Sequence, residues 1–235
     1  KDVTPYKELD AAKTNFIASI SHELKTPLFA IRMSAQLLDD ERIGELNKDQ
    51  KELLESVKSN SERLVRISGE LLDMSQIETG HIQLKKEKIR PEIIVMRAMQ
   101  AVQQHASQAD IELKENLEDG LPTLSVDEEK TTWVLINFLT NAIKYSPEGN
   151  KVEVYVTRKD NNINFMVKDY GKGIDKEYLS KVFDKYFKVP GSNQKAGTGL
   201  GLSISKEFIE AQGGTIWAES ELGSGSVFGF SFPLM

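Results

Sequence analysis

Apolar residues recur every three or four positions in the first third of the chain, in two separate runs. The runs cover residues 6–38 and 53–74. This spacing places the apolar side chains on one face of a helix, so the pattern predicts two long amphipathic helices. The polar stretch between them, which contains Gly44 and Asn47, predicts the connection of a helical hairpin.

The predicted hairpin is too long to cover its own apolar stripes. At 1.5 Å per residue each helix would run roughly 45 to 50 Å, and two helices side by side leave part of each stripe in water. A second copy of the hairpin is the simplest cover, because two hairpins form a four-helix bundle around a two-fold axis. We therefore expect residues 1–80 to form a homodimer.

After residue 80 the pattern changes to short alternating runs separated by helical stretches. Alternation predicts strands at 111–113, 152–156, 163–167, 215–218 and 227–232. The three-four spacing predicts helices at 91–109, 127–145, 176–182 and 200–212. The mixture predicts an α+β sandwich with one sheet and its helices on one face. The chain is thus expected to hold two domains, 1–80 and 81–235.

Composition and charge exclude several classes of protein. Of the 235 residues, 39% are hydrophobic and 28% are charged, which is typical of a soluble globular protein. No apolar run approaches the roughly 18 residues of a membrane span, and a net charge of -6 gives no basic patch for a nucleic acid. The absence of cysteine excludes disulfides and thiolate metal sites. Because the chain begins at Lys1, we expect it to be a piece of a longer protein.

Candidate chemistry in the first helix centres on His22. The helical spacing turns this residue away from the apolar stripe, so its imidazole is expected to face solvent. A lone surface histidine usually has no function. Here, however, Glu23 follows it, Thr26 lies one turn further on the same face, and Pro27 is expected to bend the turn. A neutral imidazole nitrogen can attack phosphorus while a carboxylate orients the other ring nitrogen.

A second group of candidates lies on the helix predicted over 127–145. Asn137, Asn141 and Lys144 are spaced four and three apart, so they share one face of that helix. An amide oxygen there could hold a hydrated magnesium ion that also binds phosphate oxygens. Two asparagines on a helix are more often simply a solvated face.

Two glycine-containing segments complete the candidates. Asp169 ends a predicted strand ahead of Gly171 and Gly173, where a carboxylate acceptor could read an exocyclic amine, although such turns also occur for backbone reasons alone. The segment 197–201 opens a helix whose free N–H groups would attract phosphate. Its spacing fits neither a Walker loop nor a Rossmann turn. The glycine-rich stretch 191–201 is expected to be a mobile loop.

Taken together, five segments resemble the H, N, G1, F and G2 boxes of sensor histidine kinases. In chain order they are 21–28 (SHELKTPL), 137–145 (NFLTNAIKY), 169–173 (DYGKG), 183–188 (FDKYFK) and 197–202 (GTGLGL). The resemblance covers nearly the whole chain. It implies a helical hairpin that forms a dimeric four-helix bundle, followed by an α/β sandwich that binds ATP, of the type shared with Hsp90 and gyrase.

The resemblance also implies a role for each matching residue. His22 would be the phosphoacceptor, Glu23 its general base, and Thr26 a residue of a phosphatase reaction. Asn141 would be the main ligand of Mg²⁺, and Asp169 would read the adenine of ATP. The other residues expected to line the nucleotide are Asn137, Lys144, Tyr145, Gly171, Gly173, Ile174, Phe183, Phe187, Lys188, Gly197, Thr198, Gly199, Leu200 and Gly201.

Two positions depart from what related proteins have. Lys188 stands where the family often has arginine, so it would approach the γ-phosphate as a point charge rather than as a bidentate fork. Asn137 stands where the hydrolytic ATPases of the wider superfamily place glutamate. A carboxylate can activate water and an amide cannot, so this departure favours a kinase over an ATPase.

The same resemblance implies partners and a location. We expect a homodimer through residues 1–80, a response regulator whose receiver domain accepts the phosphoryl group on an aspartate, and no nucleic acid. Contact with a membrane would come only through upstream segments, so the chain would be a cytoplasmic fragment of a protein anchored in the bacterial inner membrane. Two alternatives stay open: a catalytically silent ATP-binding interaction module, and an enzyme that acts chiefly as a phosphatase of its regulator.

Overall fold

The computed structural model describes residues 4–40, 42–79, 82–190 and 197–234. Within these ranges, the side chains of residues 4–18, 21 and 22 lie outside the described part. The chain divides into two compact units, Lys1–His81 and Ile82–Met235, and each is considered by itself. Over the described residues, no helix combines the length and the apolar character that crossing a membrane requires.

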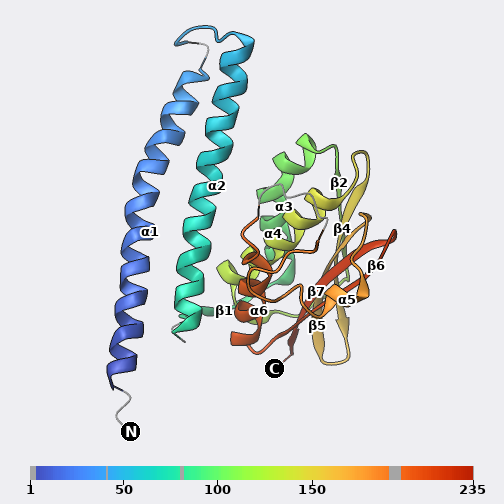
Figure 1. Ribbon diagram of the computed structural model, residues 1–235. Coiled ribbons are helices and arrows are strands. Elements are labelled where there is room, and N and C mark those ends of the chain that lie inside the picture. Colours follow the sequence, from blue (N-terminus) through green and yellow to red (C-terminus); the bar gives the residue numbers. More distant parts are fainter. Residues whose placement is uncertain (1–3, 41, 80–81, 191–196, 235) are drawn as a thin grey trace. The chain divides into compact units, whose positions relative to one another are not determined.

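The first unit is a hairpin of two helices, α1 (Thr4–Leu38) and α2 (Lys48–Glu78), which run side by side (Figure 1). A capping box starts α2. The Asn47 side chain accepts a hydrogen bond from the backbone N–H of Gln50, and the Gln50 side chain accepts one from the N–H of Asn47, both at 2.9 Å. The two helices confirm the hairpin predicted from the three-four spacing.

Much of the apolar surface of the hairpin is uncovered within one chain. Among the described side chains, the buried hydrophobic residues are Leu28 and Ala35 in α1 and Leu54 and Met74 in α2. The large hydrophobic residues left exposed on the two helices are Ile20, Leu24, Phe29, Ile31, Met33, Leu37, Leu38, Leu53, Val57, Leu64 and Leu71. Exposed apolar surface of this extent usually marks an interaction surface.

A five-stranded sheet with the strand order β2-β4-β5-β7-β6 forms the base of the second unit. Its strands are β2 (Glu112–Leu117), β4 (Lys151–Lys159), β5 (Asn162–Asp169), β6 (Thr215–Glu221) and β7 (Gly225–Pro233). β2 and β4 pair in parallel, and the other neighbours are antiparallel. A separate two-stranded antiparallel sheet consists of β1 (Lys86–Ile89) and β3 (Leu124–Asp127).

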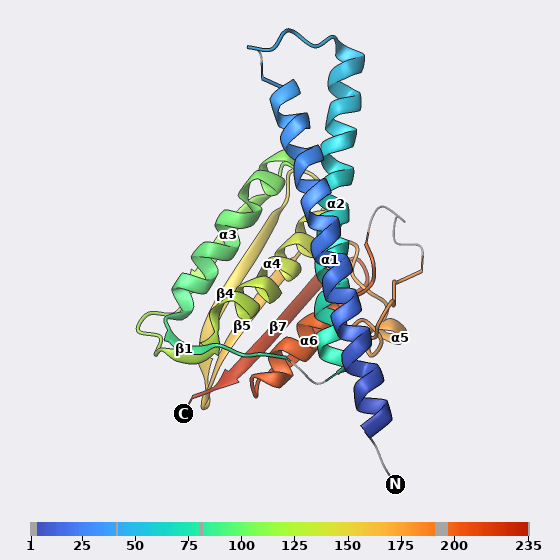
Figure 2. The ribbon, with the colours of Figure 1, turned by 90° about the vertical axis from the view of Figure 1, so that its left-hand side faces the viewer.

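Three helices cover one face of this sheet: α3 (Pro91–Gln108), α4 (Glu128–Tyr145) and α6 (Gly201–Ala211). Figure 2 shows them in front of the strands. Every second residue of β5 from Ile163 to Asp169 is buried, as the pleat requires for a face packed on helices. The Phe138 ring of α4 lies 5.6 and 6.0 Å from those of Phe228 and Phe230 in β7. This confirms the predicted sheet with helices on one face.

The opposite face of the sheet carries mostly half-exposed side chains, with Glu153 buried among them. The ring of Trp217 in β6 lies over Gly229 in β7, where a Cβ atom would come within 2.5 to 2.6 Å of the indole. Glu153 of β4 accepts a hydrogen bond from the hydroxyl of Tyr170 and pairs with Lys151 at 2.9 Å. These contacts lower the pKa of Glu153 to about 2, and the hydrogen bond from Tyr170 has the largest effect.

The second unit differs from the sequence-based prediction in its short strands and in one helix. The strand expected over 111–113 is longer, since β2 comprises Glu112–Leu117. The β1–β3 sheet was not predicted, because a four-residue strand is too short for its alternation to stand out from a loop. The helix expected over 176–182 is shorter: α5 comprises Lys176–Leu179, and turns follow it.

Candidate functional site

Asp169 ends strand β5 on the face covered by the helices and has only 4% of its surface exposed. Its Oδ1 accepts hydrogen bonds from the backbone N–H of Gly171 at 2.9 Å and of Ser226 at 3.2 Å. Burial raises the pKa of Asp169 above its usual value, against the lowering effect of these hydrogen bonds. A carboxyl group held in this way can accept a hydrogen bond from a bound ligand.

The turn that follows Asp169 passes close to neighbouring backbone. A side chain at Gly171 would collide with the carbonyl of Tyr145 at the end of α4. Gly173 has a φ of 71°, which favours glycine, and a side chain there would collide with the backbone of β6. The N–H of Ile174 donates to the Ser220 hydroxyl at 2.7 Å. The glycines are therefore required by close approach, and the turn is fixed between α4 and β6.

Helix α4 carries both candidate asparagines, and their surroundings differ. Asp127 caps the helix by accepting from the N–H of Lys130 at 2.9 Å. Asn137 donates from Nδ2 to the Ser205 hydroxyl of α6 at 2.9 Å. Asn141 lies one turn further on and is half-buried. The Asn137 amide thus joins two helices, whereas among the described residues no such bond is made by the Asn141 amide.

The end of α4 brings a cation to the glycine segment. Lys144 is exposed, and its Nζ lies 4.9 Å from the ring centroid of the exposed Tyr145. The same Nζ lies 3.8 Å from where a Cβ atom on Gly197 would stand. Residues 191–196, which belong to the loop expected over 191–201, lie outside the described residues.

The segment 197–201 is held at two points before it continues into α6. Gly199 has a φ of 78°, and its carbonyl accepts from the N–H of Tyr186 at 2.9 Å. Gly201 begins α6 against the Asn137 side chain, since a Cβ atom there would lie 2.7 Å from Asn137 Oδ1. The free N–H groups of the first turn of α6 are therefore set beside α4.

The segment after α5 adds aromatic side chains. The Phe183 ring packs edge-on against Phe228 of the core, with centroids 6.3 Å apart. The Phe187 ring lies 6.1 Å from that of Tyr178. Lys188 follows and is exposed. Phe183 is thus anchored in the sheet core, and the cation of Lys188 is free to approach a ligand from solvent.

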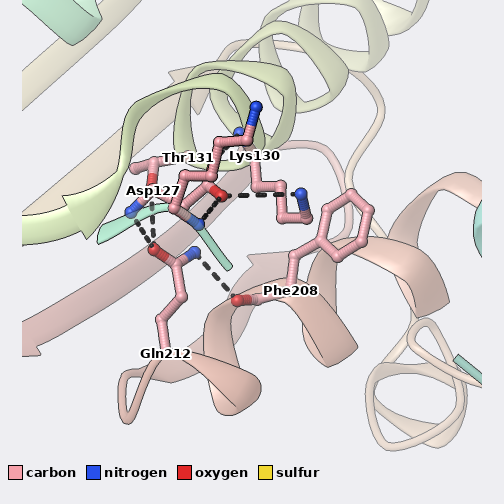
Figure 3. Close-up of polar contacts among 6 residues, drawn as sticks. Asp127, Lys130, Thr131, Phe208 and Gln212 are labelled. Atoms are coloured by element: carbon pink, nitrogen blue, oxygen red, sulfur yellow. Dashed lines mark hydrogen bonds and ion pairs between the residues drawn. The ribbon is translucent and has the colours of Figure 1, made fainter. Parts of the chain in front are cut away.

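A buried polar junction joins the beginning of α4 to the end of α6 (Figure 3). Gln212 Oε1 accepts from the N–H of Asp127 at 2.6 Å and from the Thr131 hydroxyl at 3.4 Å, and Nε2 donates to the carbonyl of Phe208 at 2.9 Å. The Phe208 ring meets Trp133 of α4 edge-on at 5.6 Å. Both ends of the α4–α6 interface therefore carry a polar bond between the helices.

The same junction holds the segment by which the chain enters the second unit. The N–H of Lys85 donates to Asp127 Oδ2 at 2.8 Å. The ammonium group of Lys86 donates to the backbone carbonyl of Gln212 at 2.9 Å. The entry segment is thus hydrogen-bonded to the cap of α4 and to the end of α6.

The structure brings several of the predicted residues of the second unit close together, whereas Phe183 and Phe187 contact other aromatic rings. Three close approaches connect the residues brought together: Asn137 with Gly201, Lys144 with Gly197, and Tyr145 with Gly171. A buried carboxyl group lies on one side of this site, and an ammonium group and helix N-terminal N–H groups lie on the other. Such a site suits a ligand with a donor-bearing ring and an anionic tail.

Three residues of this arrangement were not among the predicted site residues: Ser205, Ser226 and Gln212. Their hydrogen-bond partners lie 68, 57 and 85 positions away in the chain. Local spacing carries no signal for such pairs. Ser226 alone could have been inferred, from its place opposite Asp169 once β5 and β7 are paired.

The remaining candidates belong to the first unit. His22 lies within α1, and its side chain falls outside the described part of the structure. Glu23 and Thr26 are exposed on the same helix. Helix α1 continues through Pro27, and the bend expected there stays a prediction.

Comparison with known proteins extends the similarity over both units. Residues 126–235 match the model of a "Histidine kinase-, DNA gyrase B-, and HSP90-like ATPase", and residues 12–80 match a "His Kinase A (phospho-acceptor) domain". The sensor histidine kinase WalK of Bacillus subtilis is 36% identical over 241 residues, which cover 99% of this chain and 38% of that protein. The sensor protein KdpD of Clostridium acetobutylicum is 32% identical over 230 residues, covering 96% and 25%.

A solved structure has a similar fold over almost the same range. The crystal structure of full-length ShkA in complex with AMPPNP matches with a TM-score of 0.74 and 26% identity, covering 93% of this chain and 45% of that one. The likeness therefore includes the arrangement of elements as well as the sequence.

Proposed function

We propose that this chain, which belongs to the sensor histidine kinases of two-component systems, transfers the γ-phosphoryl group of ATP to its own His22. The chain spans 38% of the length of its Bacillus relative and 25% of its Clostridium relative. The observation that carries the proposal is the convergence of α4, the turn after β5 and the glycine segment 197–201 on one site of the second unit.

The residues of that site fit an adenine nucleotide. The buried Asp169 carboxyl is a suitable acceptor for the exocyclic amine of adenine. Lys144, beside Gly197, and the N-terminus of α6 at Gly201 place positive charge where the phosphates would lie. The ShkA structure was determined with the ATP analogue AMPPNP, which is consistent with this choice of ligand.

Asn141 is the proposed ligand of Mg²⁺. It is half-buried on α4, whereas the amide of Asn137 is engaged with Ser205. Within the described ranges, no three His, Asp or Glu side chains gather as a metal site, so the other ligands would be phosphate oxygens and water, as is common for this ion. When bound, magnesium neutralises charge on the phosphates.

The phosphoryl transfer itself would occur at His22. A neutral imidazole nitrogen forms a bond to the γ-phosphorus, and the bond from that phosphorus to the bridging oxygen of ADP breaks. The proton on the other ring nitrogen passes to Glu23. Lys144 and Lys188 offset the negative charge on the phosphates as point charges. Because Asn137 cannot activate water, competing hydrolysis of ATP is slow.

The proposed partners, a second copy of the chain and a response regulator, would both bind to the first unit. The uncovered apolar residues of α1 and α2 support a homodimer through residues 1–80, in which two hairpins form a four-helix bundle. The receiver domain of a response regulator would accept the phosphoryl group from His22 on an aspartate, and Thr26 would take part in the later hydrolysis of that aspartyl phosphate by water. Attachment of the whole protein to a membrane would come from segments outside this chain.

Incubation of the chain with γ-labelled ATP and Mg²⁺ tests the proposed function. We expect a label that is acid-labile and alkali-stable, as a phosphorylated imidazole is, and that is lost in His22→Gln. Nucleotide affinity should stay nearly unchanged in that variant, because His22 and the nucleotide site belong to different units. Persistent acid-labile label in His22→Gln would refute the assignment.

A further inference from the structure

Two buried serines of α6, Ser203 and Ser205, differ in one contact. Each hydroxyl donates to a nearby backbone carbonyl: Ser203 to that of Leu200 and Ser205 to that of Gly201, both at 2.8 Å. Ser205 also accepts from Asn137 Nδ2 in α4 at 2.9 Å. In the part of the chain that the structure describes, Ser203 has no such bond to α4. We call the Asn137–Ser205 bond the clasp.

The Asn137 amide also fixes how closely the first residue of α6 approaches α4. A Cβ atom at Gly201 would lie 2.7 Å from Asn137 Oδ1 and 3.1 Å from Nδ2. The backbone at Gly201 therefore rests against this amide, while its carbonyl accepts from the Ser205 hydroxyl. The N–H groups of this first turn are free of helical partners and are the donors proposed for phosphate. One amide and one hydroxyl thus contribute directly to holding them beside α4.

We propose that Asn137 and Ser205 are positioning residues that together hold the first turn of α6 at the distance from α4 that the nucleotide phosphates require. The inference rests on the proposed kinase function and deepens it, because Asn137 then acts through Ser205 and Gly201 rather than by contacting the metal ion. Loss of the clasp weakens nucleotide binding and raises KM for ATP. The transfer step at His22 changes less, because the nucleophile belongs to the first unit.

The matched pair Ser205→Ala and Ser203→Ala isolates the clasp. Both substitutions remove a buried hydroxyl and its bond to a backbone carbonyl, but only Ser205→Ala removes an acceptor for Asn137. In the full chain, we expect Ser205→Ala to raise the Kd for AMPPNP with Mg²⁺, and the KM for ATP, roughly three- to tenfold, with a smaller effect on kcat. Ser203→Ala should change each by less than about twofold. Equal effects of the two variants, or none, would overturn the proposal.

A double-mutant cycle tests whether Asn137 and Ser205 act as a unit. Once Asn137→Ala has removed the clasp, adding Ser205→Ala should raise the Kd for AMPPNP little further, because the bond is already lost. Fully additive effects would contradict the proposal. If Asn137→Ala does not fold, Asn137→Ser replaces it, since a serine side chain is too short to reach Ser205.

Failure of the proposed function can be told apart from failure of the clasp. A wild-type chain that binds AMPPNP but takes up no label on His22 would refute the kinase reaction, and the Kd values would still decide the role of Ser205. A wild-type chain that binds no nucleotide would overturn both proposals.

Discussion

At the scale of single residues, burial of the Asp169 carboxyl group favours ligand binding but lowers the stability of the folded chain. Its pKa in the folded chain lies above the ordinary value of 3.8 because burial disfavours the charged form. The folded state therefore binds this proton more tightly than the unfolded chain does. It follows that the free energy of unfolding falls as the pH rises from the ordinary pKa through the raised one. At neutral pH the carboxylate is a useful acceptor and a source of instability.

The substitution Asp169→Asn should therefore separate the two effects. The amide keeps an acceptor for the N–H groups of Gly171 and Ser226 and carries no charge, so we expect a higher urea midpoint than wild type at about pH 7. Affinity for ATP should fall at least about tenfold, because an amide donor can now face the adenine amine. The stability gain should shrink as the pH falls through the raised pKa of Asp169, because the wild-type carboxyl then becomes protonated. A variant less stable than wild type at neutral pH would contradict this reasoning.

Thr26 offers a second prediction at this scale. It lies one helical turn beyond His22 and is exposed, so its hydroxyl could orient the water that attacks an aspartyl phosphate in a docked receiver domain. Thr26→Ala should lower dephosphorylation of the regulator severalfold or more, and autophosphorylation of His22 much less, since that transfer uses no water. Assays of regulator dephosphorylation and of His22 autophosphorylation, run in parallel on the variant and the wild type, measure this difference. An equal loss of both would indicate that Thr26 only supports the helix ahead of Pro27.

At the scale of elements, the sequence predicts what repeats locally and misses what depends on distant pairing. The three-four spacing was sufficient for the five long helices, and alternation was sufficient for the central strands such as β5. The short strands β1 and β3 carry no usable period. The candidate site residues came from short motifs in a fixed order. By contrast, Ser205 and Gln212 become meaningful only when α4 and α6 lie side by side.

The junction between these helices gives a prediction for an element. In Gln212→Met the buried N–H of Asp127 loses its acceptor, so we expect a loss of about 1 to 3 kcal/mol in the free energy of unfolding. Urea denaturation of the full chain measures this loss in the free energy of unfolding. Gln108→Met, an equal change at an exposed position near the end of α3, is the control and should cost less than about 0.5 kcal/mol. Similar values for both variants would mean that the junction adds nothing to stability.

At the scale of the whole molecule, the uncovered apolar stripes belong to the first unit, and we expect assembly to depend on them. Leu64 of α2 is 50% exposed and lies on the stripe, whereas Leu222 of the second unit is 60% exposed and lies between β6 and β7. Leu64→Glu should shift the chain from dimer to monomer in sedimentation, because a buried charge in the bundle is costly. Leu222→Glu should leave the dimer intact. A wild-type monomer, or a Leu64→Glu dimer, would rule out this interface.

Both tryptophans of the chain, Trp133 and Trp217, lie in the second unit. Trp133 touches Phe208 beside the Gln212 junction, and Trp217 lies over Gly229 on the open face of the sheet. Tryptophan fluorescence therefore reports on the second unit and gives no signal from the helical hairpin. Far-ultraviolet circular dichroism, in contrast, receives a large share of its signal from α1 and α2, which contain 35 and 31 helical residues respectively. Recording both signals on one sample would separate the melting of the two units without any added label.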